Sequence, residues 1–595
     1  MKNLKENRLI TVFRLSKQAF GEYKVQIFVL AVLSFFSGIL GGVGVNALVP
    51  LFSFVSGQGK GDDFVSLTIE KIFLFLGVDF RIKYLLVFVC LLFILQAVVM
   101  VIFSYVSAKI TLGYEEKTKS KLFSSILKSN WSYLLKEKLG HLETVLVVNV
   151  RNSSGLLGHI SGTIMVLFTM TIYILIAINI SVYITLSTLI LGLLFFLIVK
   201  PFIYKARMLS YEVDKINKDV SHHINENILG MKTVKSMFVQ DQVGSIGKNY
   251  FVRLRDLGIK FTLISASTSI FVQPASLIFI CIVFVFSYRS PSFNLAALIA
   301  VVYLIKQIFS YFEQLQKRIL NMSSLVPFLK KVLEYKQLAD KHKEEDFGQL
   351  SFNFENVLEF KNISFFYEAG TNILNDLCFS IKKGEMIGLI GHSGAGKTTI
   401  IDLLLRLFQP GGGEISVDGV NIESIRMREW RNNVGYISQD MFLKNGTIME
   451  NIKFYNEDVT DQGMEEAAKM ANIYDFIQTL PNKFSTLIGE RGVLLSAGQR
   501  QRIVIARVLA RKPKILIMDE ATSALDNESE LKIQKIIEDL KGKITVLVVA
   551  HRLSTIVNSD RLLVIDKGKI IEEGRPEELL KDKETYFYKV YNIRK

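Results

Sequence analysis

Four long stretches without a charged residue limit what this chain of 595 residues can fold into. A helix needs about 20 apolar residues to cross a membrane, so each stretch is long enough for one crossing. The longest predicts two crossings joined by a tight turn near Asn179-Ile180-Ser181, and a shorter apolar run from Ser290 to Ile305 predicts a last one. We therefore expect a bundle of six transmembrane helices in the first half of the chain. The four stretches are Val25–Gly59, Tyr84–Ala108, Asn152–Val199 and Phe261–Tyr288.

The overall composition supports a membrane protein and argues against two other classes. Half of the residues are hydrophobic, and one such run alone could be a buried helix of a large soluble core, but four of them in one half make that alternative weak. The net charge of +15 would suit nucleic acid, yet it is concentrated in the segments between the apolar runs. The three cysteines, Cys90, Cys281 and Cys378, have neither metal-binding nor disulfide spacing.

Lysine and arginine mark the segments expected on the cytoplasmic side. They are frequent in residues 1–24, 109–151 and 200–260, which places both termini in the cytoplasm by the positive-inside rule. The two long cytoplasmic loops are 109–151 and 200–260. We expect them to extend the membrane helices and to end in short crossing segments near 130–140 and 221–231. The stretch Asn225–Lys235 could touch a partner domain or be a solvated amphipathic helix.

A change of pattern places a domain boundary near residue 340. Residues 323–352 are predicted to form a polar connector, after which apolar alternation and tight turns replace the long apolar runs. The predicted domains are 1–340, the membrane domain with its cytoplasmic helix extensions, and 341–595, an α/β domain.

A glycine-rich segment opens the chemistry of the second domain. It follows a strand-like run, Met386–Ile390, and precedes a helix-like run, Thr399–Phe408. In that setting, glycines let backbone N–H groups surround phosphate oxygens, the lysine reaches the β- and γ-phosphates, and the threonine hydroxyl can bind Mg²⁺. The segment therefore predicts a nucleoside-triphosphate site; a chance turn is the weak alternative. Its residues are Gly391, His392, Ser393, Gly394, Ala395, Gly396, Lys397 and Thr398, followed by Thr399.

Three further patterns follow in order. Leu495–Gln499 opens a helix, where Ser496 is either an ordinary N-cap or a receptor for phosphate. Ile515–Asp519 is a buried strand that ends in a carboxylate suited to Mg²⁺, and Glu520 comes next, placed to polarise a water molecule. The strand Thr545–Ala550 is followed by His551, which is either structural or a ligand at a strand end.

Together these residues resemble the ATP-binding cassette transporter family, and the membrane half resembles a half-size exporter of the type IV membrane fold. Gly391–Thr398 looks like Walker A, Leu495–Gln499 like the signature and Ile515–Asp519 like Walker B. The implied fold is a membrane α-helical bundle followed by an α/β P-loop NTPase cassette.

The resemblance also implies individual roles. It makes Glu520 the catalytic base, His551 the switch histidine at the γ-phosphate, and Gln439 the Q-loop glutamine near Mg²⁺ and the attacking water. Tyr367 matches the aromatic residue that stacks on adenine, and Ser523–Asp526 matches the D-loop. The remaining residues expected to contact ATP or its metal are Ser496, Gly498, Gln499 and Asp519.

Two residues depart from the family pattern. Ala497 stands in the signature where the family usually has glycine; a conformation open only to glycine would cost alanine about 1 kcal/mol or more. Leu487, in a segment resembling the X-loop, stands where an acidic residue is common. The alanine is expected to affect the turnover rate, and the leucine is expected to affect one cross-domain contact.

The family resemblance implies a mechanism. The signature of one subunit closes on the ATP held by another, so we expect a homodimer, with a heterodimer as the competing view. ATP binding would close the cassettes and hydrolysis would reset them, exporting or flipping a substrate by alternating access.

An amphipathic substrate, a lipid or lipid-linked saccharide, is favoured, because the crossings hold few charges and the glycine-rich first crossing resembles that of lipid-linked glycan exporters. Lys306 is interpreted as either a contact for an anionic headgroup or a snorkelling or ion-paired side chain.

Other functions remain open. A multidrug or peptide exporter would share the architecture, as would an ATP-gated channel or regulator; a soluble ATPase of DNA repair would not carry the membrane runs. The expected location is a bacterial cytoplasmic membrane, in contact with membrane lipids and without nucleic acid. The expected cofactors are ATP and Mg²⁺.

Overall fold

The computed structural model divides into two compact units, which are described separately. The first comprises residues 1–129 and 133–343, and the second comprises residues 130–132 and 344–595. The structure describes residues 8–47, 50–51, 64–75, 77–267, 270–288, 295–367, 372–519, 526–549 and 556–593.

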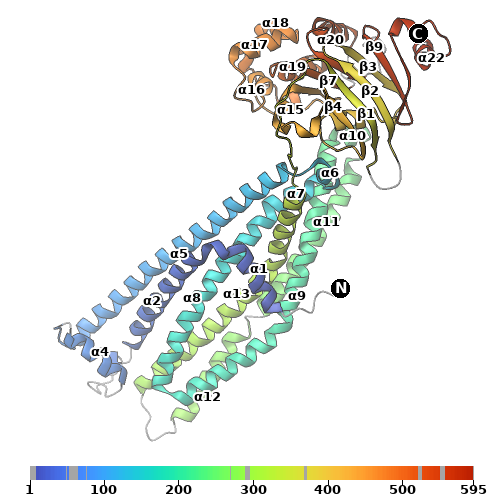
Figure 1. Ribbon diagram of the computed structural model, residues 1–595. Helices are drawn as coiled ribbons and strands as arrows, with labels where there is room; N and C mark the ends of the chain where they lie inside the picture. Colours follow the sequence, from blue (N-terminus) through green and yellow to red (C-terminus); the bar gives the residue numbers. More distant parts are fainter. Residues whose placement is uncertain are drawn as a thin grey trace. The chain divides into compact units, whose positions relative to one another are not determined.

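The first unit is a bundle of long helices that run side by side (Figure 1). Among the described residues, five segments are long and apolar enough to cross a membrane: Arg14–Asn46, Ile82–Leu127, Gly140–Asn179, Val182–Leu229 and Gln240–Phe286. The long helix α13, Leu295–Lys341, takes the place of the sixth predicted crossing. In chain order, the helices up to the start of the second unit are α1 Arg8–Phe20, η2 Gly21–Tyr23, α2 Lys24–Asn46, α4 Phe64–Phe75, α5 Ile82–Leu127, α6 Trp131–Lys136, α7 Leu139–Thr144, η3 Val145–Asn149, α8 Val150–Ile180, α9 Val182–Leu229, α10 Met231–Ser236, α11 Gln240–Ser267, α12 Val272–Tyr288 and α13.

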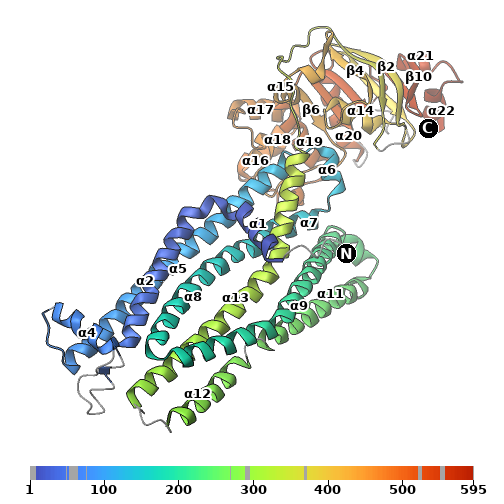
Figure 2. The ribbon, with the colours of Figure 1, turned by 60° about the horizontal axis from the view of Figure 1, so that its bottom comes forward.

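Close helix packing in this bundle depends on the glycines of α2. A Cβ added to Gly38 would lie 2.5 Å from Ile172 Cδ1 of α8, and one added to Gly42 would lie 2.7 Å from Ile176 Cδ1. On the neighbouring side, a Cβ on Gly41 would lie 2.5 Å from Gln96 Nε2 of α5. Small residues therefore bring α2 against both α5 and α8, as the sequence predicts for a membrane interface; their alignment is visible in Figure 2.

Some predicted boundaries hold and others are wrong. The turn between α8 and α9 lies at Ser181, as predicted. The second short crossing segment is α10, residues 231–236, rather than 221–231, because α9 continues to Leu229 before Gly230 ends it. The first half of the predicted connector 323–352 is part of α13, where Val326, Phe328, Leu329 and Val332 are buried. The apolar residues of this polar-looking stretch recur at helical spacing, and their burial extends the helix.

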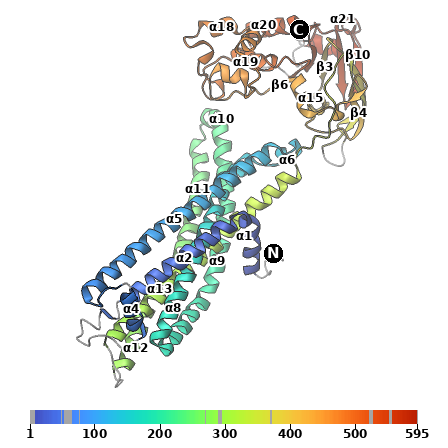
Figure 3. The ribbon, with the colours of Figure 1, turned by 60° about the vertical axis from the view of Figure 1, so that its left-hand side comes forward.

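The long α9 and α11 lie next to each other, as do α8 and α13 (Figure 3). Apolar side chains of α13 fill two neighbouring clusters. Leu304 and Ile308 pack with Tyr173 and Ala177 of α8, while Val301, Ile305 and Phe309 pack with residues of α12 and α9. Helix α13 is therefore held on two sides by other helices of the same unit.

The second unit contains two sheets. An antiparallel sheet has the order β2-β1-β4-β5, and a six-stranded sheet has the order β10-β9-β3-β8-β7-β6, in which only β10 runs antiparallel to its neighbour. The elements are β1 Val357–Phe365, β2 Leu374–Lys382, β3 Met386–Gly391, α14 Lys397–Leu404, β4 Gly412–Val417, β5 Val420–Asn421, η4 Ile422–Ser424, α15 Met427–Asn433, β6 Val434–Ile437, α16 Ile448–Lys453, α17 Asp461–Met470, α18 Tyr474–Thr479, η5 Lys483–Ser485, η6 Glu490–Gly492, α19 Ala497–Leu509, β7 Ile515–Asp519, α20 Asn527–Leu540, β8 Thr545–Val549, β9 Arg561–Asp566, β10 Lys569–Gly574, α21 Pro576–Leu579 and α22 Tyr586–Ile593.

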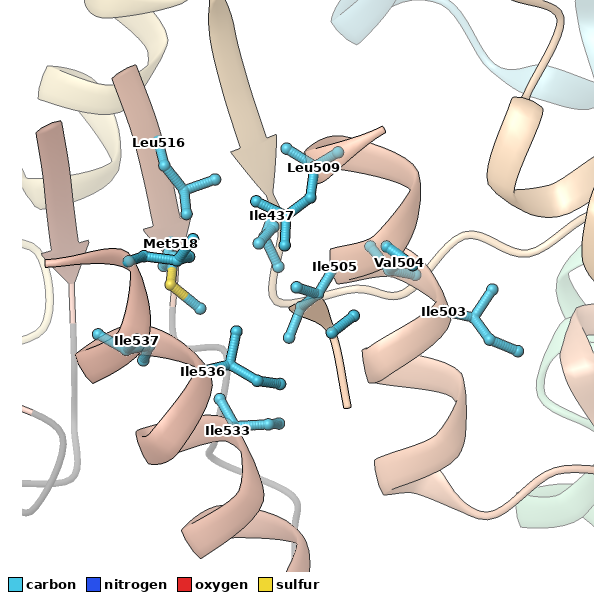
Figure 4. Close-up of a cluster of buried hydrophobic side chains, with 14 of the residues drawn as sticks. Ile437, Ile503, Val504, Ile505, Leu509, Leu516, Met518, Ile533, Ile536 and Ile537 are labelled. Carbon is cyan, nitrogen blue, oxygen red and sulfur yellow. The ribbon is translucent and has the colours of Figure 1, made fainter. Parts of the chain in front are cut away.

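Two apolar cores fix the helices on the faces of the six-stranded sheet. One joins α19 and α20 to β7, with Ile505, Ile533, Ile536 and Met518 among its members (Figure 4). The other holds α14 through Ile400 and Leu404 and contains the fully buried Trp430, whose Nε1 donates to the Leu404 carbonyl at 2.7 Å. The helix after the glycine-rich segment, α14, begins two residues earlier than predicted and ends at Leu404 instead of Phe408.

Candidate functional site

Parallel strands bring the predicted site residues to one edge of the sheet. Strands β3, β8, β7 and β6 are parallel neighbours, so their carboxyl ends lie at the same edge, where open α/β sheets bind ligands. Gly391 ends β3 and Asp519 ends β7, while Gln439 follows β6 by two residues and is exposed. Sequence positions more than a hundred residues apart therefore meet at this edge.

The glycine-rich segment forms a loop between β3 and α14. Gly396 has φ 105° at the N-cap of α14, a left-handed conformation that favours glycine. His392, Ser393, Gly394 and Thr398 are exposed, so the loop and the start of the helix are accessible to a ligand. The helix dipole adds positive potential at the same place, which makes the loop suited to an anion.

Lys397 lies folded against its own loop. It is buried, and its Nζ donates to the carbonyls of Gly391 and His392 at 2.8 and 2.9 Å. These two bonds hold the ammonium group at the mouth of the loop. The next two residues divide their roles, since Thr398 is exposed to a ligand and Thr399 is buried in the core of the unit.

Asp519 lies in a cluster of polar groups that the sequence analysis identified only in part. Tyr436 of β6 makes a hydrogen bond to Asp519; burial and, next, the nearby Asp519 charge raise the pKa of Tyr436. Asp402 lies one turn after Thr398 in α14. Burial raises the pKa of its carboxyl to about 6, a hydrogen bond from Tyr367 opposes that shift, and the charge of Asp519 adds to it.

The types of oxygen donor at this edge of the sheet fit a magnesium ion. The exposed Thr398 hydroxyl, the Asp519 carboxylate and the Gln439 amide provide hard oxygen donors of the kind that Mg²⁺ prefers. The charge of Asp519 also disfavours the charged form of Asp402, and a divalent cation beside Asp519 would offset that repulsion. Asp402 and Tyr436 were missed from the sequence, although the spacing of Asp402 from Thr398, one helical turn, was a usable signal.

Tyr367 lies near the start of α14. Its hydroxyl is 3.2 Å from Thr399 Oγ1 and 3.5 Å from Asp402 Oδ2, and its ring packs edge-on against Phe365 and Phe408. The side chain remains about half exposed. The predicted aromatic residue therefore lies beside the helix of the phosphate loop with part of its ring accessible.

Ser496 caps the helix that begins the signature. Its Oγ accepts from the Gln499 N–H at 3.2 Å, and Gln499 Oε1 accepts from the Ser496 N–H at 2.9 Å, which is a capping box. The N-cap interpretation is therefore correct for the structure, and the residue also stands at an accessible helix N-terminus. The N-cap role of Ser496 is therefore compatible with a role as a receptor for phosphate.

The alanine of the signature needs no special backbone conformation. Ala497 is the first residue of α19 and is absent from the described residues with positive φ, so the strain considered from the sequence does not arise. The neighbouring Gly498 has a different requirement, since an added Cβ would lie 2.2 Å from Ser529 Oγ of α20. Ser529 N–H in turn donates to Asp526, the N-cap of α20, at 3.2 Å. Close packing, rather than backbone conformation, therefore explains the glycine at 498.

The remaining predicted residues are placed as follows. Leu487, in the segment resembling the X-loop, is 62% exposed, so its apolar side chain leaves that surface without a carboxylate at this position. Glu520, His551 and the D-loop residues Ser523–Leu525 lie outside the described residues, next to the described ends of β7 and β8.

A membrane helical unit followed by a phosphate-loop cassette defines a class of protein, the membrane transport ATPases. Comparison with known proteins agrees. A model of the ABC transporter transmembrane region matches residues 27–317, and a model of the ABC transporter matches residues 374–523. The chain is 33% identical over 484 residues to a putative multidrug export ATP-binding/permease protein of Bacillus subtilis, covering 80% of this chain and 83% of that protein. The chain belongs to the ABC transporter family.

Further relatives define the fold and the range of functions. A heterocyst differentiation ATP-binding protein of Nostoc is 28% identical, covering 79% of this chain and 78% of that protein. An ATP-dependent lipid A-core flippase of Saccharophagus degradans is 43% identical, covering 43% of this chain and 44% of the flippase. The structure of a bacterial Atm1-family ABC exporter with ATP bound has a TM-score of 0.77 at 23% identity, covering 97% of this chain and 98% of that one. The chain is thus an ABC exporter that binds ATP and couples its hydrolysis to transport across a membrane.

Proposed function

We propose that the chain exports or flips an amphipathic substrate, a lipid or a lipid-linked saccharide, by alternating access in a homodimer. The main support is the combination of a phosphate loop, a capped signature serine and an Asp519 cluster in one cassette, so that each subunit can supply the phosphate loop of one ATP site and the signature of the other. A multidrug substrate, suggested by the name of the Bacillus subtilis relative, is the second candidate.

Each residue of the site has a role in this proposal. Lys397 and the loop glycines hold the β- and γ-phosphates of ATP, Tyr367 faces adenine, and Ser496 with Gly498 and Gln499 closes on the nucleotide of the partner subunit. Thr398, Gln439 and Asp519 would hold Mg²⁺, which would neutralise phosphate charge. Glu520 takes the proton of the attacking water, and His551 orients the γ-phosphate.

The predicted transmembrane segments of the first unit contain few charged residues, which favours an amphipathic substrate. Lys306 on α13 is exposed and has no ion-pair partner among the described residues, so the ion-pair interpretation lacks support there and the headgroup and snorkelling interpretations remain. A bacterial cytoplasmic membrane with both termini inside is part of the proposal, because the basic segments 109–151 and 200–260 would then face the cytoplasm with the ATPase.

A substitution at Glu520 tests the assigned chemistry. Glu520→Gln keeps the shape of the side chain and removes the base, so ATP binding should persist while turnover falls by about a hundredfold or more. The measurement is nucleotide binding and phosphate release by the purified protein in proteoliposomes, together with ATP-dependent transfer of fluorescent lipids. An active Glu520→Gln protein would refute the base, and passive conductance without hydrolysis would favour a channel.

A further inference from the structure

Arg318 is a cation of the membrane unit without a matching anion. No carboxylate lies within ion-pair distance of its guanidinium, and the group makes no hydrogen bond, among the residues that the structure describes. Its neighbour Lys317 differs, since Lys317 Nζ lies 2.7 Å from Glu313 Oε1. A partly buried charge without a partner is costly, so its presence calls for an anion that the bundle itself does not supply.

The guanidinium of Arg318 packs against helix α8 at Gly162, where the helix surface has no side chain. A Cβ added to Gly162 would be only 1.8 Å from Arg318 Nη1 and 2.4 Å from its Cζ. Only glycine at this position lets the planar group rest against the α8 backbone. Arg318 is therefore half-buried between α13 and α8 instead of extending freely along the bundle surface.

His159 provides a second donor at the same place. It precedes Gly162 by three residues in α8, so both lie on one face of that helix, and its ring is close enough to Arg318 for their charges to interact. The described residues offer the His159 ring no hydrogen-bond partner. Two donors from different helices thus converge on one gap.

Both residues would lie near the level of lipid headgroups if Leu295 and Ile180 mark the opposite face of the hydrocarbon core. From Leu295 at 1.5 Å per residue, Arg318 is about 35 Å along α13, slightly more than the roughly 30 Å thickness of a membrane hydrocarbon core. Counted back from the end of α8 at Ile180, His159 lies at a similar depth of about 32 Å. An oxyanion attached to an acyl chain could reach this level while its chain remains in the hydrocarbon.

We propose that Arg318 and His159 bind an oxyanion of the transported amphiphile, a phosphate-type headgroup. The guanidinium fork donates two parallel hydrogen bonds to two oxygens, and the imidazole donates a third. This inference rests on the proposed function and names its substrate class as anionic. Free inorganic phosphate has the same chemistry, and the experiment distinguishes the two sources.

Equilibrium binding without nucleotide tests the site. The full chain in phosphatidylcholine nanodiscs is titrated with a fluorescent phosphatidylglycerol, with the phosphatidylcholine analogue as comparison and inorganic phosphate as competitor. Arg318→Gln should weaken phosphatidylglycerol binding about tenfold, Arg318→Lys should restore part of it, and Gly162→Ala should weaken it while keeping both donors. Lys330→Gln is the matched control, because Lys330 is exposed on the same helix and lies 3.7 Å from Glu334.

The outcomes separate clearly. Competition by inorganic phosphate assigns the site to the free anion, and its absence assigns it to the headgroup; either supports the site if binding depends on Arg318. Wild-type affinity in Arg318→Gln, an equal loss in Lys330→Gln, or equal binding of both lipids would overturn the proposal. Since no ATP is present, a failure of ATP-driven transport would refute the proposed function without changing these results.

Discussion

At the scale of single residues, the two carboxylates near the phosphate loop have different environments. Asp519 ends a parallel strand and has a hydroxyl partner in Tyr436, whereas Asp402 is partly buried in α14 beside Tyr367. Burial makes ionisation of Asp402 unfavourable, whereas Asp519 is the carboxylate that we propose as a metal ligand. This difference gives the cassette a measurable dependence on pH.

Asp402→Asn should make the cassette more stable at pH 7.5 and flatten its pH dependence between about pH 4 and 6. The folded pKa of about 6 lies above the ordinary value of 3.8. The folded state therefore holds more protons in that window, and stability falls as pH rises through it. Asparagine remains neutral and removes this loss. Unfolding without Mg²⁺ or nucleotide can be followed by Trp430 fluorescence in a Trp131→Phe background.

Asp539→Asn is the control for that measurement, because Asp539 is an exposed carboxylate of the same unit. The substitution removes one exposed negative charge and no buried one. It should therefore leave the slope of stability against pH unchanged. If Asp402→Asn kept the wild-type slope of stability against pH, burial would not determine the pKa of the Asp402 carboxyl.

At the scale of elements, the contact between α2 and α8 depends on the absence of a few side-chain atoms. The added Cβ of Gly38 would meet Ile172 Cδ1, the terminal carbon of one side chain. The next atom is the backbone Cα of Thr169 at 3.3 Å, so a second substitution at Ile172 would relieve the closer of the two contacts. Such a pair tests the packing without changing polarity.

Gly38→Ala should lower the apparent Tm of the purified protein, since overpacking typically costs about 1–3 kcal/mol. Ile172→Val removes Cδ1 and should restore part of the loss in the double variant, because Thr169 Cα stays 3.3 Å from the added Cβ. Gly113→Ala is the matched control, because nothing lies within 4 Å of a Cβ added there, and it should be neutral or slightly stabilising. Additive losses in the double variant would contradict the assigned contact.

The sequence predicted best the elements whose ends are marked by the length or the end of an apolar run. Strand β7 matches its predicted residues because four apolar residues end at Asp519, and the turn at Ser181 follows from the length of the apolar run. The polar-looking end of α13 was mistaken for a connector, since its buried residues are separated by lysines and glutamates. The contacts of Asp402, Ser529 and Arg318 depend on neighbours distant in the chain, which one sequence does not reveal.

At the scale of the whole molecule, one chain contains one phosphate loop and one signature. In the proposed dimer each nucleotide lies between the loop of one subunit and the signature of the other. A loop defect in one chain and a signature defect in the other therefore fall in the same site of a mixed dimer and leave the second site intact.

Mixing two inactive variants should therefore restore activity. Lys397→Ala disables the loop and Ser496→Arg blocks the signature, so each homodimer should be inactive. A mixed dimer combines both defects in one site and leaves the other intact, which should recover up to about a quarter of wild-type ATPase activity. The check is phosphate release after coexpression.

The control is the double variant Lys397→Ala/Ser496→Arg coexpressed with wild type, in which every mixed dimer has two damaged sites. Its activity should come only from the wild-type homodimers, about a quarter of the dimers when the two chains are expressed equally and pair at random. The two mixtures should therefore have similar activities. An inactive first mixture, with about half of wild-type activity in this control, would indicate that each chain completes its own site.

The capping box at α19 also determines which hydrogen Ser496 can offer. Its oxygen already accepts from Gln499 N–H, and a hydroxyl has a single proton. That proton is not used by the cap, so it stays available for a partner beyond the helix N-terminus. The serine could therefore keep its cap and donate to an incoming γ-phosphate at the same time.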